Sequence, residues 1–207
     1  MKNKFLQFLF LFAMLRSAIG QFNSPDSLLR IATPIDADSI AYRIARQFSW
    51  QTLYPYFSLR NPLHIQIMRD AIAQQPEYPF FMDSLRDEIN SRIMLNGLIA
   101  WDKYRLNFPQ SDPLQGESLL LLFSHSSHFE IRVLCADLLN RLQPEKAVPR
   151  LRQLLTDDHP MVIRMAAYSL SILGDTASLP RLDSLQESED FYLRFTIRQV
   201  IKKLKQL

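Results

Sequence analysis

The second half of the chain repeats its pattern of apolar and polar positions at an interval of 31 residues. A shift by this interval places EKAVPRLRQLL (145–155) on TASLPRLDSLQ (176–186), so that Pro149 coincides with Pro180. The segments around this pair keep the same register, with three aligned apolar sets: Ile131, Val162 and Leu193; Leu139, Leu170 and Ile201; Leu142, Leu173 and Leu204. Registers that agree without an insertion indicate an internal repeat, which is typical of stacked helical units.

Each repeat unit is predicted to consist of two helices joined by a short turn. The first helix is expected at about 145–156, with Pro149 in its first turn, where a missing N–H group costs nothing. The second is expected from about Pro160 to Leu173, with Gly174 as its left-handed C-cap. Helical spacing predicts a buried stripe on each: Val148, Leu151, Leu154 and Leu155 on the first; Val162, Ala166, Ser169, Leu170 and Leu173 on the second. The small members of the second stripe predict close approach by a neighbouring helix.

The first half of the chain is also predicted to be helical, but it lacks the 31-residue period. Three helical segments are expected here: DADSIAYRIARQF (36–48), NPLHIQIMRDAIAQQP (61–76) and DSLRDEINSRIMLNGLIAW (83–101). The second of them has Asn61 as its cap, and the third carries Leu85, Ile89 and Ile93 on one face behind Asp83. This half is compatible with diverged repeats and with a helical cap that covers the open end of the array.

An aromatic segment, SWQTLYPYFSLR (49–60), connects the first two of these helices. We expect it to be a packed connector, because aromatic side chains dominate protein cores. The alternative is a groove lined by Trp50, Tyr54, Tyr56 and Phe57.

Three segments of the second half carry a recognisable unit: HFEIRVLCADLLNRL (128–142), AVPRLRQLLTDDHPMVIRMAAYSLSILGD (147–175) and DFYLRFTIRQVIKKL (190–204). The unit resembles a HEAT repeat, especially the short phycobilisome-lyase-like kind, over residues 113–207. The resemblance implies an all-α, right-handed α-solenoid of about three HEAT-like helix pairs behind a helical N-terminal half (21–110). It also implies a ladder between units in which Asp157 pairs with Arg132 or Arg194. The central unit departs from the family pattern, because Ile163 occupies the arginine position and Arg164 follows it.

The first twenty residues differ in kind from the rest of the chain. Lys2 and Lys4 precede an apolar run from Phe5 to Leu15, and small residues end the segment at Gly20. This order is typical of a secretory signal peptide, and the run is shorter than the roughly twenty residues that span a bilayer. We therefore expect an exported protein, periplasmic or secreted, that contacts a membrane only if the segment (1–20) is retained as an anchor.

Export changes the meaning of the net charge of +3. Three of the 24 basic residues lie in the predicted signal, which leaves 21 basic against 21 acidic residues in the mature chain. A neutral chain lacks the electrostatic footprint of a nucleic-acid-binding protein. The basic C-terminal residues, Arg198, Lys202, Lys203 and Lys205, are expected to complement the dipole of a last helix.

Candidate chemistry gathers in FSHSSHFE (123–130), where serine and histidine lie close together. By the repeat register, Ser127 and His128 align with Asp158 and His159, so helix capping explains these residues without a reaction. A more specific alternative is a metal site built from His125, His128 and His159 with Asp157 or Asp158. The spacing of these residues matches no compact ligand motif. The single cysteine, Cys135, has apolar neighbours and is expected to be a structural thiol. We expect no catalytic residue, no metal and no cofactor.

The outward stripe of the second helices is the remaining candidate site. Four-residue spacing places these residues on it: Val133, Asp137 and Arg141; Arg164, Tyr168 and Ile172; Phe195, Gln199 and Lys203. Six of them form the expected protein-binding surface: Asp137, Arg141, Arg164, Tyr168, Phe195 and Gln199. Arginine and tyrosine are favoured at protein contacts, so a non-catalytic scaffold is the expected function. The alternatives are an accessory subunit of an envelope enzyme, lyase-like or metal-dependent, and a signal-anchored assembly factor.

Overall fold

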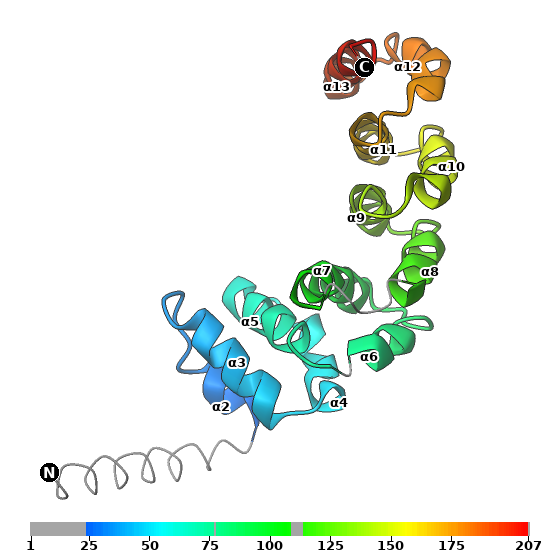
Figure 1. Ribbon diagram of the computed structural model, residues 1–207. Helices are drawn as coiled ribbons and strands as arrows, with labels where there is room; N and C mark the ends of the chain where they lie inside the picture. The colour runs from blue at the N-terminus through cyan, green and yellow to red at the C-terminus, as the bar shows by residue number, and fades with distance from the viewer. Residues whose placement is uncertain (1–23, 77, 109–113, 207) are drawn as a thin grey trace, which may run out of the picture.

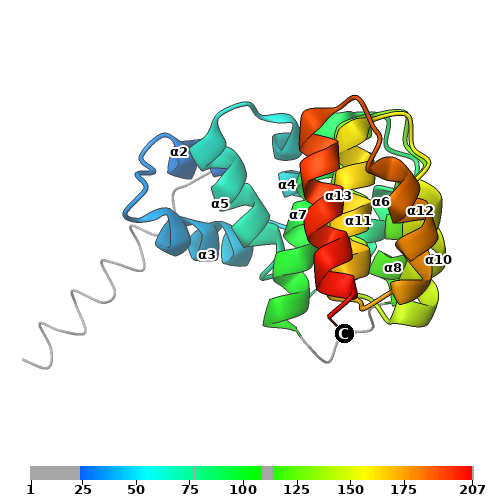
Figure 2. The ribbon, with the colours of Figure 1, turned by 90° about the horizontal axis from the view of Figure 1, so that it is seen from above.

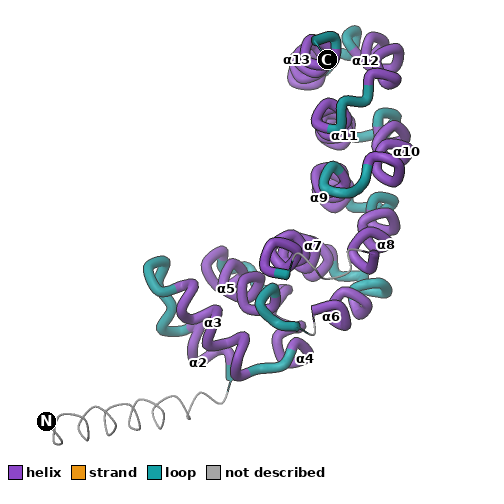
Figure 3. The backbone as a smooth tube through the Cα atoms, viewed as in Figure 1, coloured by secondary structure: helices purple, strands orange, loops and turns teal. Residues whose placement is uncertain are grey.

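The computed structural model describes residues 24–76, 78–108 and 114–206. Within these ranges every regular element is a helix (Figure 3). The elements are α2 (Pro25–Leu29), α3 (Ala37–Gln47), α4 (Trp50–Leu53), η1 (Tyr54–Ser58), α5 (Pro62–Ile72), α6 (Tyr78–Ser84), α7 (Ser91–Asn107), α8 (Leu114–Phe123), α9 (Phe129–Leu139), α10 (Pro144–Leu154), α11 (Pro160–Ile172), η2 (Thr176–Ser178), α12 (Leu179–Leu185) and α13 (Phe191–Leu204). The predicted signal segment (1–20) and the predicted junction at residues 110–113 lie outside the described residues.

The helices alternate between two layers along the whole array (Figure 1). In one layer, here called the inner layer, each helix packs against the next in the order α3, α5, α7, α9, α11 and α13. The partners α8, α10 and α12 lie together on the other side, as the view along the array shows (Figure 2). The array turns near α7, and the inner layer lies on the inside of this bend (Figure 1). This arrangement confirms the prediction of an all-α solenoid.

Helix α11 begins and ends where the sequence predicts. Pro160 is its first residue, and the Nδ1 atom of His159 accepts a hydrogen bond from the backbone N–H of Met161 at 3.2 Å. At the other end Gly174 adopts a φ of 71°, a left-handed conformation that favours glycine. The turn residue and the glycine therefore fix both limits of the helix.

Close packing between α9 and α11 depends on the small residues of the buried stripe. Ser169 is fully buried, and its hydroxyl donates to the carbonyl oxygen of Ala136 on α9 at 2.7 Å. The Asn140 side chain donates to the same hydroxyl at 3.2 Å. Because Val162, Ala166 and Leu170 are also fully buried, the predicted stripe is the packing face of α11.

The first helix of the central unit starts close to its predicted limit, but Pro149 lies deeper in it than predicted. Gln143 precedes Pro144, which is the first residue of α10, so Pro149 lies in the helix interior and not in its first turn. Its counterpart Pro180 does lie in the first turn, because α12 begins only at Leu179. The prediction was wrong for Pro149 because a second proline supplies the helix start.

A second correction concerns the segment 83–101. Instead of one helix, α6 ends at Ser84 and α7 starts at Ser91, where Asn90 accepts a hydrogen bond from the backbone N–H of Arg92 at 3.0 Å. The Glu88 carboxylate closes the turn by accepting from the backbone N–H groups of Ile89 and Asn90. Ile89 is consequently 91% exposed, so the predicted apolar face through this residue does not form.

The aromatic segment 49–60 is a packed connector, as predicted. Phe57 is fully buried, and its ring centroid lies 5.0 Å from that of Phe81 on α6. The rings of Tyr54 and Trp50 also surround Phe81, at 5.7 and 6.3 Å. Asn61 then caps α5 by accepting from the backbone N–H of Leu63 at 3.0 Å, which confirms its predicted role.

Candidate functional site

The six residues of the expected binding surface lie on α9, α11 and α13, but they differ in what they contact. Arg141 forms ion pairs with Asp137 at 3.2 Å and with Asp102 of α7, also at 3.2 Å. Arg141 therefore joins α9 to α7, its neighbour in the inner layer, while Asp137 pairs with Arg141 beside it; both side chains are mostly covered.

Arg164 and Tyr168 lie at the centre of the surface, on α11. Tyr168 is 51% exposed, whereas Arg164 is half-buried. The Nε atom of Arg164 donates to the hydroxyl of Thr196 at 3.2 Å, and its guanidinium lies 5.7 Å from the centre of the Tyr192 ring. Arg164 thus reaches forward to α13 and bridges two units through neutral partners.

A pocket of about 280 Å³ lies beside these two residues, between α9, α11 and α13. Its lining combines apolar and polar side chains: Val133, Met161, Arg164, Met165, Tyr168 and Thr196. Methionine side chains adapt to irregular contacts, so this lining suits a large apolar group.

Exposed apolar side chains concentrate on α11 and α13. The set, here called the inner-face apolar patch, comprises Met161, Tyr168, Ile172, Phe191, Tyr192 and Phe195. Phe195 is 58% exposed, and Gln199 is exposed one turn further along α13. Sequence reasoning missed Met161, Phe191 and Tyr192. Met161 and Tyr192 are 31 residues apart, so a second stripe at the repeat interval was the signal that could have found them.

The ion pair that the resemblance implies between neighbouring units is present between the first and the second unit. Arg132 donates from Nε and Nη2 to the two carboxylate oxygens of Asp157, each at 2.8 Å. It also donates to the carbonyl oxygen of Ser126 at 2.9 Å. Burial raises the pKa of Asp157, but hydrogen bonds from Arg132 and from the backbone N–H of His159 outweigh it, so the pKa falls below its ordinary value.

The corresponding positions in the other units make different contacts. Arg194 donates to the carbonyl oxygens of Ser188 and Glu189 in its own turn, at 2.6 and 2.9 Å. In the central unit the arginine position holds Ile163, which is 8% exposed and packs in the core. Arg152 instead pairs with Asp175, with a hydrogen bond of 2.8 Å from its Nε atom.

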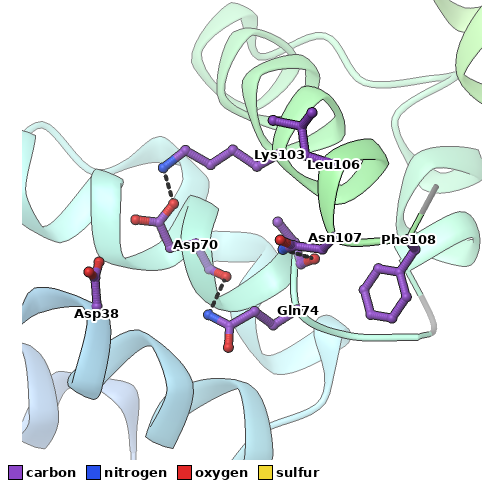
Figure 4. A pocket seen from close by; sticks show the side chains of 8 residues that line it. Asp38, Asp70, Gln74, Lys103, Leu106, Asn107 and Phe108 are labelled. Carbon is purple, nitrogen blue, oxygen red and sulfur yellow. Dashed lines mark hydrogen bonds and ion pairs between the residues drawn. The ribbon is translucent and has the colours of Figure 1, made fainter.

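Another cavity, of about 520 Å³, lies among α3, α5 and α7 (Figure 4). Lys103 pairs with Asp70, and the Gln74 amide donates to the carbonyl oxygen of Asp70 at 2.9 Å. Asn107 donates to the carbonyl oxygen of Ala73 at 3.1 Å, and Asp38 lies across the gap on α3. These hydrogen bonds hold the walls together, so the polar groups of this cavity are largely engaged within the chain.

The comparisons with known proteins agree with the repeat seen in the structure. The sequence model of the family described as HEAT repeats matches residues 116–202. These residues form a HEAT-repeat array. The finding confirms the resemblance drawn from the sequence, while the narrower likeness to phycobilisome-lyase-like repeats stays a prediction.

Solved structures are similar in fold at low sequence identity. The crystal structure of an engineered protein from the Northeast Structural Genomics Consortium is 14% identical, with a TM-score of 0.50 over 88% of this chain and 96% of that one. A designed armadillo repeat protein is 13% identical over 87% and 99% of the two chains, with a TM-score of 0.49. Human deoxyhypusine hydroxylase in complex with glycerol is also 13% identical, over 86% and 82%, with a TM-score of 0.42. No curated protein sequence matches the chain.

The HEAT-repeat array contains a further periodic contact that sequence reasoning missed. Arg150 donates to the hydroxyl and the carbonyl oxygen of Ser124, both at 2.7 Å, at the end of α8. Arg181 donates in the same way to the carbonyl oxygen of Leu155 at 3.1 Å, at the end of α10. Each arginine thereby satisfies a terminal carbonyl of the preceding first helix and complements its dipole. The recurrence of Pro-Arg-Leu at both positions was the signal.

The serine and histidine residues of the HEAT-repeat array do not assemble into a reactive group. Ser124 is fully buried and accepts from Arg150, whereas His125 and His128 are exposed on the turn. Burial and the nearby charge of Arg150 lower the pKa of His125. Among the described residues, no three histidine, cysteine or acidic side chains are grouped so that they could hold a metal ion.

Cys135 lies on α9, in the core of the array. Its side chain is fully buried, and burial raises the pKa of the thiol. A buried thiol of raised pKa is unreactive, which agrees with the structural role expected from the sequence.

None of the helices in the described part of the chain has the length and apolar character needed to cross a bilayer.

Proposed function

We propose that this protein is an exported, non-catalytic scaffold that binds another protein through the inner faces of α11 and α13. A HEAT-repeat fold is typical of protein-interaction scaffolds. The observation that carries the proposal is the inner-face apolar patch, in which four exposed aromatic rings lie on two adjacent helices beside Arg164. Contiguous exposed apolar side chains mark interaction sites, and aromatic and arginine residues supply much of the binding energy there.

The pocket beside Tyr168 indicates what the partner would present. A pocket of about 280 Å³ with two methionines fits one large aliphatic or aromatic side chain. The guanidinium of Arg164 at its edge favours an acidic or carbonyl group next to that side chain. We therefore expect a partner segment with a large apolar residue beside an acidic one.

The binding surface can be tested with a matched pair of double variants. Arg164→Ala with Tyr168→Ala removes the centre of the surface, and we expect recovery of the partner in an affinity pull-down from the envelope fraction to fall at least about tenfold. The control is Arg46→Ala with Tyr42→Ala, which removes the same residue types from α3, where Tyr42 is also 51% exposed. Circular dichroism must show an unchanged helical content in both variants. Equal recovery of the same proteins by both variants and the wild type would contradict the proposal.

Export is the second part of the proposal, and it rests on the segment 1–20. N-terminal sequencing of the protein isolated from its native envelope fraction should give a start at or near Gln21. A start at Met1 in membrane-bound protein would instead indicate an anchored assembly factor. Recovery from the cytoplasm with an intact N-terminus would contradict export.

A further inference from the structure

A cavity of about 480 Å³ lies at the edge of the molecule where three inner-layer helices begin. Its lining includes Pro62 from the first turn of α5, Ser91 from that of α7 and Glu130 from that of α9. These helices pack side by side, so their N-terminal ends meet at one edge. Because each N-terminus carries about half a positive charge, the backbone of this edge favours an anion.

Most of the charged side chains that line the cavity are cationic. Arg60, Arg69 and Arg92 line it, and Glu130 is its one carboxylate. The ion pairs found among the described residues join other side chains, so within this part of the chain none of the three arginines is paired with a carboxylate. Arg60 and Arg92 are exposed, so their guanidinium groups are open to a ligand at the cavity's mouth.

Arg69 is held in place by a neutral partner. Its Nε atom donates to the side-chain oxygen of Asn96 at 3.0 Å, and Asn96 in turn donates to the carbonyl oxygen of Phe57 at 2.6 Å. Asn96 is buried and Arg69 is half-buried, so the guanidinium has lost part of its hydration. Burial accordingly lowers the pKa of Arg69, and the opposing effect of the nearby Asp70 carboxylate is the smaller one. An amide does not neutralise this charge, whereas an anion in the cavity would.

The rest of the wall combines polar residues, Ser91, Asn96, His128 and Glu130, with an apolar group. Leu59, Ile65, Leu95 and Ile131 line the cavity beside the arginines. Its volume is within the range of about 300–1,000 Å³ that is typical of small-molecule sites. The cavity therefore combines a cationic end with an apolar wall.

We propose that this cavity, here called the basic pocket, is a binding site for a small organic oxyanion with an apolar body. The oxyanion lies against Arg60 and Arg92 at the N-terminal ends of α5 and α7, and against Arg69, which lines the cavity from the last turn of α5. The apolar body covers Ile65, Leu95 and Ile131. A carboxylate and a phosphate monoester share this chemistry. The site is separate from the inner-face apolar patch on α11 and α13.

Calorimetric titration of the full chain tests the proposal with four probes: phenylacetate, phenyl phosphate, neutral 2-phenylethanol and inorganic phosphate. We expect at least one of the two aromatic anions to bind about tenfold more tightly than both the neutral alcohol and inorganic phosphate. The anion that binds more tightly identifies the ligand as a carboxylate or a phosphate. Equal binding of the neutral alcohol, or the absence of binding by both aromatic anions, would overturn the proposal.

Two double variants assign the binding to this cavity. Arg60→Gln with Arg92→Gln should weaken binding of the aromatic anion at least about tenfold, because two of its three cations are removed. Arg198→Gln with Lys202→Gln removes the same charge from exposed positions on α13 and should leave the affinity within about twofold. Equal losses in the two variants would show that net charge, not the basic pocket, attracts the anion, and would overturn the assignment.

Discussion

Single side chains join neighbouring units of the HEAT-repeat array, and the Arg132–Asp157 pair is the most fully bonded of these contacts. The Asp157 side chain is 8% exposed and accepts from Arg132 and from the backbone N–H of His159. Its neighbour Asp158 also contacts Arg132, at 2.6 Å, but is 88% exposed. Because solvent screens an exposed pair, the two adjacent aspartates should differ in their contribution to stability.

Replacing Asp157 should therefore destabilise the protein in a pH-dependent way. Asp157→Asn is expected to lower the free energy of unfolding by about 1–3 kcal/mol at pH 7, because the bonds to Arg132 weaken. The pKa of Asp157 is lower in the folded protein than in the unfolded chain, so its contribution is present above the unfolded pKa of about 3.9 and is lost as the pH falls through the folded pKa. Urea unfolding at pH 7 and pH 3 measures both quantities.

Asp158→Asn is the matched control for this experiment. It removes a neighbouring carboxylate that is almost fully solvated, so its effect should stay within about 0.5 kcal/mol at either pH. Equal losses for the two variants at pH 7, or a loss for Asp157→Asn that persists undiminished at pH 3, would show that the buried pair has no such role.

At the scale of whole elements, sequence spacing predicted helices wherever the chain repeats itself. The limits of α11 follow from Pro160 and Gly174, whose backbone requirements are local and do not depend on the rest of the fold. The start of α10 was predicted within a residue, but Pro149 was wrongly placed in the first turn, because Pro144 already supplies the proline at the start of the helix. Ile89 was misjudged because four-residue spacing runs across a turn that the Glu88 carboxylate closes.

The candidate surface was predictable only as far as its geometry follows from helical spacing. Tyr168 and Phe195 lie exposed as the spacing indicates. Asp137 and Arg141 have the same spacing, yet they pair with each other, and Arg141 also pairs with Asp102 of α7, a helix outside the recognised repeat. Contacts between the repeat array and the N-terminal half depend on tertiary packing, and the 31-residue register does not predict them. The basic pocket escaped prediction for the same reason, because Arg92 of α7 meets Arg60 and Arg69 only through the packing of α7 against α5.

For the whole molecule, the layer of inner helices continues from the HEAT-repeat array into the N-terminal half without a break. Helix α7 packs against α5 on one side and α9 on the other. We infer that the N-terminal helices act as diverged repeats that share one core with the array, and not as a separate cap. The hydrophobic core includes residues from α2 through α13, which supports this inference.

A shared core predicts that both halves unfold together, and the contact between Trp101 of α7 and Gly116 of α8 is the place to test it. Trp101 is 4% exposed, and a methyl group added at Gly116 would overlap its indole ring. Gly116→Ala should therefore cost about 1–3 kcal/mol of stability.

Both tryptophans, Trp50 and Trp101, lie in the N-terminal half, so their fluorescence reports that half while circular dichroism reports every helix. In urea the two signals should give coincident transitions in the wild type, and Gly116→Ala should move both midpoints down together. Independent halves would instead give separate transitions, because each would then unfold at the urea concentration set by its own core.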